Sequence, residues 1–390
     1  MSKATILIFG LMLSALVHCN SEGGAPFYVS EGLYDQSDTS ALGLRRVRGA
    51  ETFTIFRPSA GSDHFSHGAV LTSFKGRLYC MWQSSAEDED TPDTWTAYSY
   101  SSDGGKTWAE PMVLCPSPGG DAYATSGGWH ASAEKLIAYI NVFTSRNSEG
   151  HVLYLSSDDG EHWSAARDLL MADGSRMDAI IEQDIHVLPT GRLLTAAHRT
   201  PGMSVCPVYT DDPAGVSGWQ YASFNCTQLK KSSRELEPSL YLKRDGSIVM
   251  MFRDQSSSYR KLAAVSRDGG KSWTDAVLTD VPDSRSKQSA GNLPDGTAFF
   301  VSNPVSCRNR YPLVLTLSDD GTCFDRAFLL RAGDEIPPAR YGVKRRPSYS
   351  YPKSLVSGGY LYVAYAVNKQ DVECVRLTLD NLQKPLPLTP

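Results

Sequence analysis

The chain has 390 residues, a formal net charge of −5, a pI of about 5.9 and 41% hydrophobic residues. Both signs of charge are interspersed, and no basic stretch is long enough to neutralise several phosphates, which argues against a nucleic-acid partner. The length predicts two or three ordinary domains, or a single domain if the chain is a closed array of repeats.

The first residues have the composition of a secretory signal. Lys3 supplies a positive charge, residues 4–17 form an almost unbroken apolar run, and Val17 and Cys19 have the spacing of a signal-peptidase site. The run is shorter than the roughly 20 residues of a membrane-spanning helix, and no second run approaches that length. We therefore predict a signal peptide over residues 1–19 and a secreted mature protein that does not associate with a membrane.

Seven of the eight cysteines lie beyond this predicted signal. The chain has no C-x-x-C pair, which argues against structural zinc. Cys206 with Cys226, and Cys307 with Cys323, are close enough in sequence to join neighbouring strands as disulfides in an oxidising compartment. The odd total leaves at least one thiol unpaired.

An eight-residue pattern, Ser-x-Asp-x-Gly-x-x-Trp, recurs along the chain. It occupies residues 101–108, 156–163 and 266–273, and a weaker copy occupies residues 317–324. Asp accepts hydrogen bonds from the backbone that follows it, Gly tolerates positive φ, and the aromatic ring packs the turn onto a sheet. The pattern therefore predicts tight turns around Asp103, Asp158, Asp268 and Asp319.

The spacing of these copies predicts the architecture. They are separated by 55, 110 and 51 residues, and the double interval implies a decayed copy near residues 211–219. One more step of about 54 residues reaches residues 371–373. Six sheet units of this size are typical of a β-propeller, which closes into a ring and so protects its sheet edges. Seven blades would require that an irregular insertion hides another unit.

The repeat units also contain pairs of β-rich runs joined by a Gly-centred turn. These turns are centred at Gly76, Gly191, Gly246, Gly296 and Gly359. Helical periodicity is almost absent, so the predicted fold class is all-β. We predict a six-bladed β-propeller over residues 50–378, with a lead-in over residues 20–49 and a tail over residues 379–390.

The turn pattern and its period resemble the sialidase (neuraminidase) superfamily, whose members are six-bladed propellers with Asp-box (BNR) repeats. The resemblance covers nearly the whole chain after the predicted signal. Other propellers also carry this turn, so the resemblance speaks more for the fold than for the chemistry. It implies a glycoside hydrolase of the exo-α-sialidase type that acts on terminal acidic sugars. No motif requires a metal and no nucleotide-binding Gly pattern is present, so we expect neither metal nor cofactor.

The resemblance implies a catalytic pair. The family uses a tyrosine nucleophile activated by a glutamate, because the substrate carboxylate would repel a carboxylate nucleophile. Glu237, which precedes Pro238 and a strand, resembles that glutamate. Tyr351, with Tyr349 as the alternative, resembles the functional tyrosine.

The resemblance also implies arginines and an acid. Arginines bind a carboxylate bidentately, and Arg253 and Arg310, with Arg308 as the alternative to Arg310, resemble the second and third of the family. The general acid is expected in the carboxylate run 87–90, where crowding raises the pKa of one member. We assign this role to Asp88.

One expected residue is missing. The family's first arginine stands about nine residues before the first Gly turn, and this chain has His67 there. Phe56-Arg57-Pro58 resembles the arginine motif, but Arg57 lies 19 residues before Gly76. We therefore expect a clamp of two arginines and a histidine.

The histidines support a second hypothesis. His64 and His67 begin the first predicted inner strand, His130 begins the second, and His198-Arg199 ends the inner hairpin of the third unit. These positions are where propeller strands meet the central funnel, so all five residues are candidates for substrate contact.

A histidine titrates near neutral pH and can act as a general base. His67 or His198 would remove the proton next to a uronate carboxylate, with Tyr351 as partner and Arg253 and Arg310 neutralising the developing charge. This predicts a lyase or hydrolase of rhamnose–glucuronate linkages. A third hypothesis is a non-catalytic glycan-binding propeller. In each case the expected partner is an acidic glycan and the expected state is a monomer.

Overall fold

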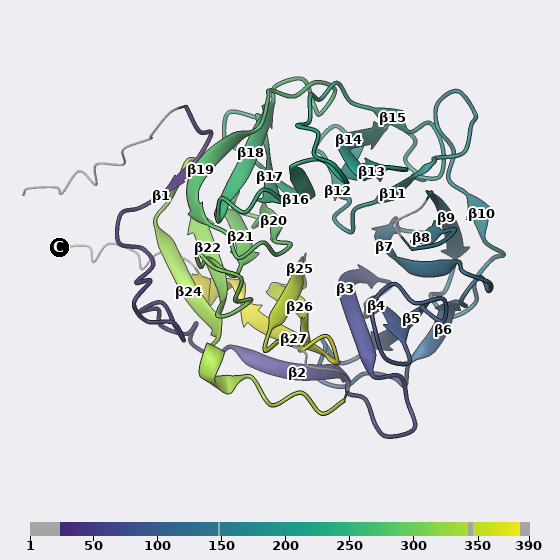
Figure 1. Cartoon of the computed structure of the whole chain (residues 1–390), viewed down its shortest axis with the longest axis horizontal. Coiled ribbons are helices and arrows are strands. Elements are labelled where there is room, and N and C mark those ends of the chain that lie inside the picture. Colours follow the sequence, from purple (N-terminus) through teal and green to yellow (C-terminus); the bar gives the residue numbers. More distant parts are fainter. Residues whose placement is uncertain (1–23, 147–148, 342–345, 383–390) are drawn as a thin grey trace, which may run out of the picture.

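The computed structural model describes residues 24–146, 149–341 and 346–382. The predicted signal peptide, and most of the predicted tail, lie outside the described residues. Six antiparallel sheets surround a central axis, which confirms the six-bladed β-propeller (Figure 1). Within the described residues, helix is limited to two 3-10 turns, η1 (Gly333–Glu335) and η2 (Leu379–Leu382). No helix in this part of the chain has the length and apolar character needed to cross a membrane.

The blades are numbered in chain order, and their strands run from the axis outward. Blade 1 consists of β3 (Phe65–Phe74), β4 (Arg77–Ser85), β5 (Trp95–Ser101) and β6 (Met112–Cys115). Blade 2 consists of β7 (Tyr123–Ala131), β8 (Leu136–Phe143), β9 (Gly150–Ser157) and β10 (Arg167–Asp168). Blade 3 consists of β11 (Ala179–Ile181) with β12 (His186–Val187), β13 (Leu193–Arg199), β14 (Ser204–Thr210) and β15 (Gln220–Tyr221).

Blades 4 to 6 follow the same plan. Blade 4 consists of β16 (Glu235–Leu242), β17 (Ile248–Asp254), β18 (Arg260–Ser266) and β19 (Val277–Pro282). Blade 5 consists of β20 (Ser289–Asn292), β21 (Ala298–Ser302), β22 (Leu313–Ser318) and β24 (Arg326–Arg331). Blade 6 consists of β25 (Tyr349–Ser357), β26 (Tyr360–Val367), β27 (Asp371–Thr378) and β2 (Glu51–Phe56).

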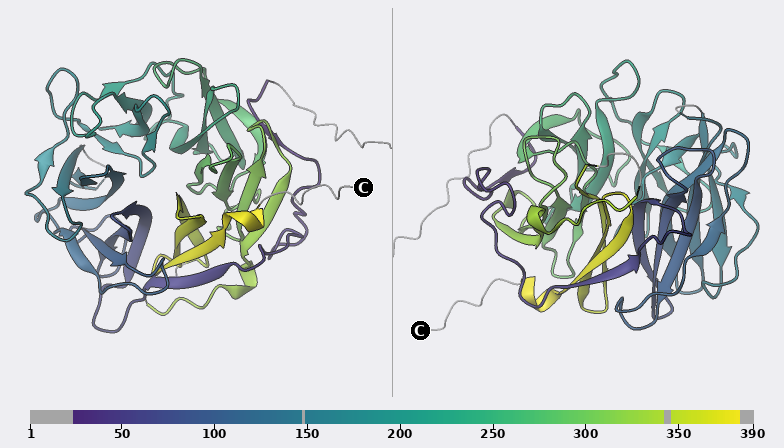
Figure 2. Two further views of the ribbon diagram at one scale, coloured as in Figure 1. Left: turned by 180° about the vertical axis from the view of Figure 1, so that it is seen from behind. Right: turned by 60° about the horizontal axis from the view of Figure 1, so that its bottom comes forward.

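The ring is closed by strands from both ends of the chain. β2 pairs with β27, so the first long strand completes the blade that the last strands begin (Figure 1). Before it, β1 (Tyr28–Val29) pairs in parallel with β23 (Cys323–Phe324). The segment between β1 and β2 runs along the outside of blade 5, as the views in Figure 2 also show. This closure removes the open sheet edges that a linear array would expose.

The core lies between the blades. Each of six apolar clusters is built mainly from two neighbouring sheets; in one of them, Val70 and Met81 of blade 1 pack against Trp129 and Ala138 of blade 2. A central strand such as β8 is therefore covered on both faces, which explains why its sequence is apolar at every position except Asn141 and does not alternate. Each large apolar side chain buried in this way contributes about 1.5–3 kcal/mol.

The repeated turns have the predicted chemistry. Asp103 Oδ1 accepts hydrogen bonds from the backbone N–H groups of Lys106 and Thr107, both at 3.0 Å, and Trp108 Nε1 donates to the carbonyl of Gly105 at 3.0 Å. The turn at Asp268 has the same contacts. The decayed copy is also present, with Asp212 accepting from three backbone N–H groups.

The predicted register is wrong by one residue in two turns. Asp159, and not Asp158, accepts the backbone hydrogen bonds in blade 2, and Asp320, and not Asp319, does so in blade 5. In both turns the accepting aspartate lies four residues before the aromatic residue instead of five, so the turn is one residue shorter than the pattern assumes. Asp158 instead forms an exposed ion pair with Lys135 at 2.6 Å.

The structure contains neither of the disulfides that the sequence suggested. Cys206 is a buried thiol, Cys226 is a half-buried thiol and Cys307 is an exposed thiol. The Cys226 sulfur accepts a hydrogen bond from Gln228 Nε2 at 2.9 Å. The pairing of strands in blades 3 and 5 therefore does not depend on covalent bridges.

Candidate active site

Glu237 and Tyr351 come from the innermost strands of blades 4 and 6, β16 and β25. Each lies at a β-bulge, precedes a proline and has positive φ, 51° for Glu237 and 56° for Tyr351. Positive φ is uncommon for a residue with a side chain and costs on the order of 1–3 kcal/mol. Both strands bear this cost at the one point where their side chains meet, which marks the point as a candidate site.

The two side chains form a hydrogen-bonded group with an arginine. The Tyr351 hydroxyl donates to Oε1 of Glu237. Arg253 Nη1 donates to Oε2 of Glu237 at 2.8 Å and lies 3.4 Å from the Tyr351 hydroxyl. Arg253 on β17 stands opposite Leu236 on β16, and this register places its guanidinium beside Glu237. We call these three residues the Tyr–Glu–Arg triad.

Electrostatics keep the triad in one protonation state. Burial disfavours the charged form of Glu237, but the positive charges of Arg253 and Lys287 outweigh burial and lower its pKa to about 2. Burial and the negative charge of Glu237 raise the pKa of Tyr351 well above its ordinary value. The resting site therefore has a protonated phenol facing an ionised carboxylate, which is the arrangement of a nucleophile and its general base.

Three further side chains surround the Tyr351 ring. The His67 ring centroid lies 4.2 Å from its centroid, Lys287 Nζ lies 5.0 Å from it, and Arg310 Cζ lies 5.2 Å from it. Two positive charges at these distances stabilise negative charge that develops on the phenol oxygen. His67 is only 1% exposed, so it contacts Tyr351 and not the open cavity.

His198 lies behind the triad. Its Nδ1 is 3.1 Å from Oε1 of Glu182, and its Nε2 is 3.4 Å from the backbone N–H of Glu237. Lys287 Nζ lies 2.8 Å from Oε2 of Glu182. All of these side chains are at least nine-tenths buried, so His198 supports the backbone of Glu237 and is not placed to touch a substrate, contrary to the prediction.

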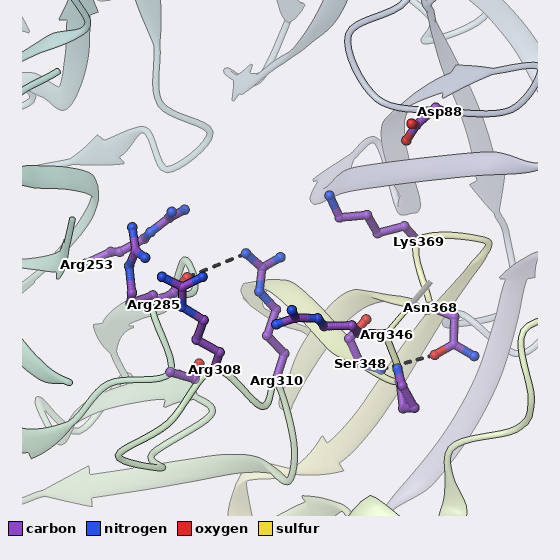
Figure 3. A pocket seen from close by; sticks show the side chains of 11 residues that line it. Asp88, Arg253, Arg285, Arg308, Arg310, Arg346, Ser348, Asn368 and Lys369 are labelled. Atoms are coloured by element: carbon purple, nitrogen blue, oxygen red, sulfur yellow. Dashed lines mark hydrogen bonds between the residues drawn. The ribbon is translucent and has the colours of Figure 1, made fainter. Parts of the chain in front are cut away.

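A cavity of about 410 Å³ opens beside the triad and receives one of its members, Arg253. Its lining is strongly basic, and Figure 3 shows the guanidinium groups facing one part of the cavity while Asp88 stands on the other side. The charged lining residues are Arg253, Arg285, Arg308, Arg310, Arg346, Lys369 and Asp88. Such a lining favours an anionic ligand.

The residues of the predicted acidic run, 87–90, lie in different surroundings. Asp88 is exposed and lines the cavity. Glu89 forms an ion pair with Lys369 and lies 4.0 Å from His67 Nε2. Burial, and then the negative charge of Glu89, raise the pKa of Asp90 to about 6, but Asp90 does not line the cavity. Asp88 is thus the member of the run that a ligand in the cavity would meet.

Three predicted substrate-binding residues lie elsewhere. His64 stacks on Tyr341 at 4.0 Å and contacts the carbonyl of Ser59 at 3.2 Å. His130 lies at the end of β7, and not at its start as predicted, where its Nε2 is 2.9 Å from the carbonyl of Pro213.

Arg199 is the third of these residues. Its guanidinium carbon lies 3.9 Å from the Tyr221 ring centroid, on the outer strand of blade 3. Arg57 is also remote from the cavity lining, because β2 is the outermost strand of blade 6 and Arg57 pairs with Asp371 at 3.1 Å. The Phe-Arg-Pro segment therefore does not supply the missing arginine.

Arg285 was not predicted, although it brings a guanidinium into the cavity from the loop between β19 and β20. Its Nη2 donates to the side chain of Gln255 at 2.9 Å, which also accepts from Arg253 Nη2 at 2.9 Å. Lys287, in the same loop, and Glu182 were missed as well. A sequence signal for Arg285 and Lys287 was available. They lie in a polar segment that leads into the inner strand of blade 5, and the corresponding segments of blades 4 and 6 carry Glu237 and Tyr351.

No group of three or more His, Cys, Asp or Glu side chains that could hold a metal ion is found in residues 24–146, 149–341 and 346–382.

Comparisons with known proteins agree with this architecture. A protein of unknown function from Dyadobacter fermentans superposes with a TM-score of 0.66 and 17% identity, over 85% of this chain and 100% of that one. A sialidase superposes with a TM-score of 0.66 and 19% identity, over 91% of this chain but 35% of that one. The NanB sialidase of Streptococcus pneumoniae, as its K499G mutant, gives a TM-score of 0.65 and 15% identity over 84% and 71%. No curated protein matches the sequence.

These identities are low, so the superpositions establish the fold and leave the reaction open. A family model, described as a BNR repeat-like domain, matches residues 76–363, which is most of the chain. The chain therefore belongs to the BNR repeat-like domain family, and its six-bladed propeller fold is similar to that of the sialidases with which it superposes.

Proposed function

We propose that this protein is a secreted, retaining exo-glycosidase that removes a terminal acidic sugar, such as sialic acid, from a glycan. The observation that carries the proposal is the Tyr351 hydroxyl donating to the Glu237 carboxylate beside a cavity lined by arginines. The signal-like composition of residues 1–19 supports action outside the cell.

In the first step, the Tyr351 oxygen attacks the anomeric carbon and its proton passes to Glu237. The bond between that carbon and the leaving oxygen breaks, and Asp88 donates a proton to the leaving oxygen. Because Glu237 is a weak base, its proton transfer completes only as the new carbon–oxygen bond forms. Lys287 and Arg310 lie over the Tyr351 ring and offset the negative charge of the phenol oxygen.

In the second step, Asp88 removes a proton from water, and the water oxygen attacks the anomeric carbon. The bond to Tyr351 breaks, and Tyr351 regains its proton from Glu237. Two displacements at one carbon give a product with the configuration of the substrate.

Tyrosine suits this cavity better than a carboxylate nucleophile. An acidic sugar brings a carboxylate next to its reacting carbon, and the neutral phenol of Tyr351 does not repel it. Arg253, Arg285 and Arg310 line the cavity and bring positive charge to that carboxylate. In this arrangement Arg285 replaces the arginine that the sequence resemblance did not locate.

The histidine-dependent lyase is less well supported by this geometry. A base that removes a substrate proton has to reach the substrate, but His67 is covered by Tyr351 and His198 lies behind Glu237. The two histidines are better placed to position the triad.

The proposal is tested by incubating the purified mature protein with sialylated glycans and with rhamnosyl-glucuronate glycans. Released sugars are quantified, and proton NMR identifies the anomer that forms first. We expect free sialic acid with retained configuration, and a rate that falls by about four orders of magnitude or more in Tyr351→Phe.

Tyr349→Phe is the matched control. Tyr349 is buried on the same strand, and its ring faces Arg331, which does not line the cavity, with the guanidinium carbon 4.9 Å from the ring centroid, so removal of its hydroxyl should leave the rate unchanged. Ultraviolet absorbance of an unsaturated uronate would establish the lyase instead. Binding without turnover on every substrate would establish a glycan-binding propeller.

A further inference from the structure

The cavity holds more positive charge than the protein itself neutralises. Among the described residues, only Arg253 of the five lining arginines forms an ion pair with a carboxylate, that of Glu237. Arg285 donates to the neutral side chain and carbonyl of Gln255, and Arg310 donates to the carbonyl of Arg285 at 3.5 Å. Hydrogen bonds to neutral acceptors leave the guanidinium charges uncompensated.

This crowding opposes the charged state of the arginines. Burial, followed by the positive charges of Arg253 and Arg308, lowers the pKa of Arg285 below its ordinary value. Arg308 and Arg346, both exposed, add two more guanidinium groups to the same cavity. Among the described residues that line the cavity, Asp88 is the one carboxylate, and it cannot neutralise four arginines.

A single substrate carboxylate uses only part of this charge. A carboxylate has two oxygens and about four acceptor positions, which two or three guanidinium groups occupy. Arg253, Arg285 and Arg310, which are half-buried, are sufficient for it. Arg308 and Arg346 remain, and Figure 3 shows their side chains on either side of Arg310.

We propose that the cavity takes a glycan with two anionic groups, and that Arg308 and Arg346 bind the second group near the cavity mouth. This inference rests on the proposed function for the identity of the first group, the carboxylate of the terminal sugar. The second group is a sulfate ester on that sugar or the carboxylate of the next sugar, because both present oxygens that arginine binds bidentately.

The first experiment does not depend on the sugar. The unfolding midpoint of the full mature protein is measured with acetate, with inorganic sulfate and with both, at constant ionic strength. Two anion subsites predict that Arg308→Gln/Arg346→Gln removes part of the stabilisation by each ion and keeps the part that Arg253, Arg285 and Arg310 provide. Unchanged stabilisation by both ions in the double variant would overturn the proposal.

The second experiment identifies the source of the second group. Calorimetry with Tyr351→Phe protein compares methyl α-sialoside, its O-sulfated form and an α2,8-linked disialoside, so that no turnover disturbs the binding. We expect one of the doubly charged ligands to bind about tenfold more tightly or better, as one added charge-assisted hydrogen bond would give. The Arg308→Gln/Arg346→Gln change should abolish this gain and leave binding of the singly charged sialoside unchanged.

The outcomes separate this inference from the proposed function. A gain for the sulfated sialoside assigns the sulfate ester, and a gain for the disialoside assigns the second carboxylate. Binding of all three with equal affinity overturns the second subsite. If none of the sialosides binds, sialic acid is the wrong sugar, and the loss of ion stabilisation in Arg308→Gln/Arg346→Gln alone decides for or against two anion subsites.

Discussion

Two groups of cations lie close together in the centre of the propeller, and they are paired differently. Three buried lysines each contact a carboxylate at 2.8 Å, whereas four of the arginines that line the cavity form no ion pair with a carboxylate in the described residues. The lysine pairs are Lys261–Asp283, Lys287–Glu182 and Lys353–Asp184.

The difference separates charge that the fold requires from charge that a ligand requires. A buried ion is tolerated only when an opposite charge and hydrogen bonds replace its water, so the lysines could not be buried without their partners. The cavity arginines keep contact with solvent and can stay charged without partners. Unpaired charge gathered at a cavity therefore points to function, while paired charge beneath it points to structure.

The largest effect is expected from breaking a lysine pair. Asp283→Asn leaves Lys261, which is 1% exposed, without a counter-charge and should lower the free energy of unfolding by about 3–5 kcal/mol. Urea unfolding followed by circular dichroism measures the change. As the control, Lys261→Met/Asp283→Leu replaces the whole pair by apolar groups and should recover most of the loss. A loss of less than about 1 kcal/mol in Asp283→Asn would show that this pairing is not required.

A second prediction concerns Glu237, whose carboxylate interacts both with a cavity arginine and with a buried lysine. Its charge interacts with Arg253, Lys287, Glu182 and Tyr351, and the cations lower its pKa from 4.5 to about 2. A carboxyl whose pKa is lower in the folded state stabilises the fold fully above its unfolded pKa, and this stabilisation disappears as the pH falls to the folded pKa. The contribution is therefore complete at neutral pH and is lost between about pH 4.5 and pH 2.

The measurement is the free energy of unfolding of the wild type and of Glu237→Gln between neutral pH and about pH 3. From pH 4.5 to pH 3 the wild type should lose about 1.6 kcal/mol more than the variant, because the slope rises toward about 1.4 kcal/mol per pH unit only below the unfolded pKa. Parallel curves for the two proteins would mean that Arg253 and Lys287 do not lower the pKa of this carboxyl.

The fold was predictable because its signals are local and repeated. Each turn aspartate and each Gly-centred hairpin specifies one blade without reference to the others. The one-residue error at Asp158 and Asp319 arose because the neighbouring residue is also an aspartate, and sequence alone does not show which of the two accepts the backbone N–H groups.

The site was predictable only where its residues stand in short motifs. Glu237 and Tyr351 precede prolines at the starts of inner strands, and the structure brings them together as the resemblance implied. Arg285 lies in a loop between two blades that carries no recognisable motif, so the sequence did not predict its place in the cavity. His130 was misplaced because β7 starts at Tyr123, seven residues earlier than expected, so the histidine lies at the far end of the strand.

The smallest effect is expected at the cavity itself. Arg308 is exposed and forms no ion pair in the described residues, so Arg308→Gln should change the free energy of unfolding by no more than about 0.5 kcal/mol. Repulsion between Arg308 and Arg285 weakens as salt screens it. Added sodium chloride should therefore stabilise the wild type more than Arg308→Gln, which urea unfolding at low and high salt measures.

The control is Arg267→Gln, which alters an exposed arginine paired with Asp245 at 3.7 Å. Salt weakens an attraction there, so added sodium chloride should stabilise the wild type less than Arg267→Gln. If Arg308→Gln lowered the free energy of unfolding by more than about 1 kcal/mol, Arg308 would contribute to stability as the buried lysines do. The distinction between paired structural lysines and unpaired ligand-binding arginines would then not hold for Arg308.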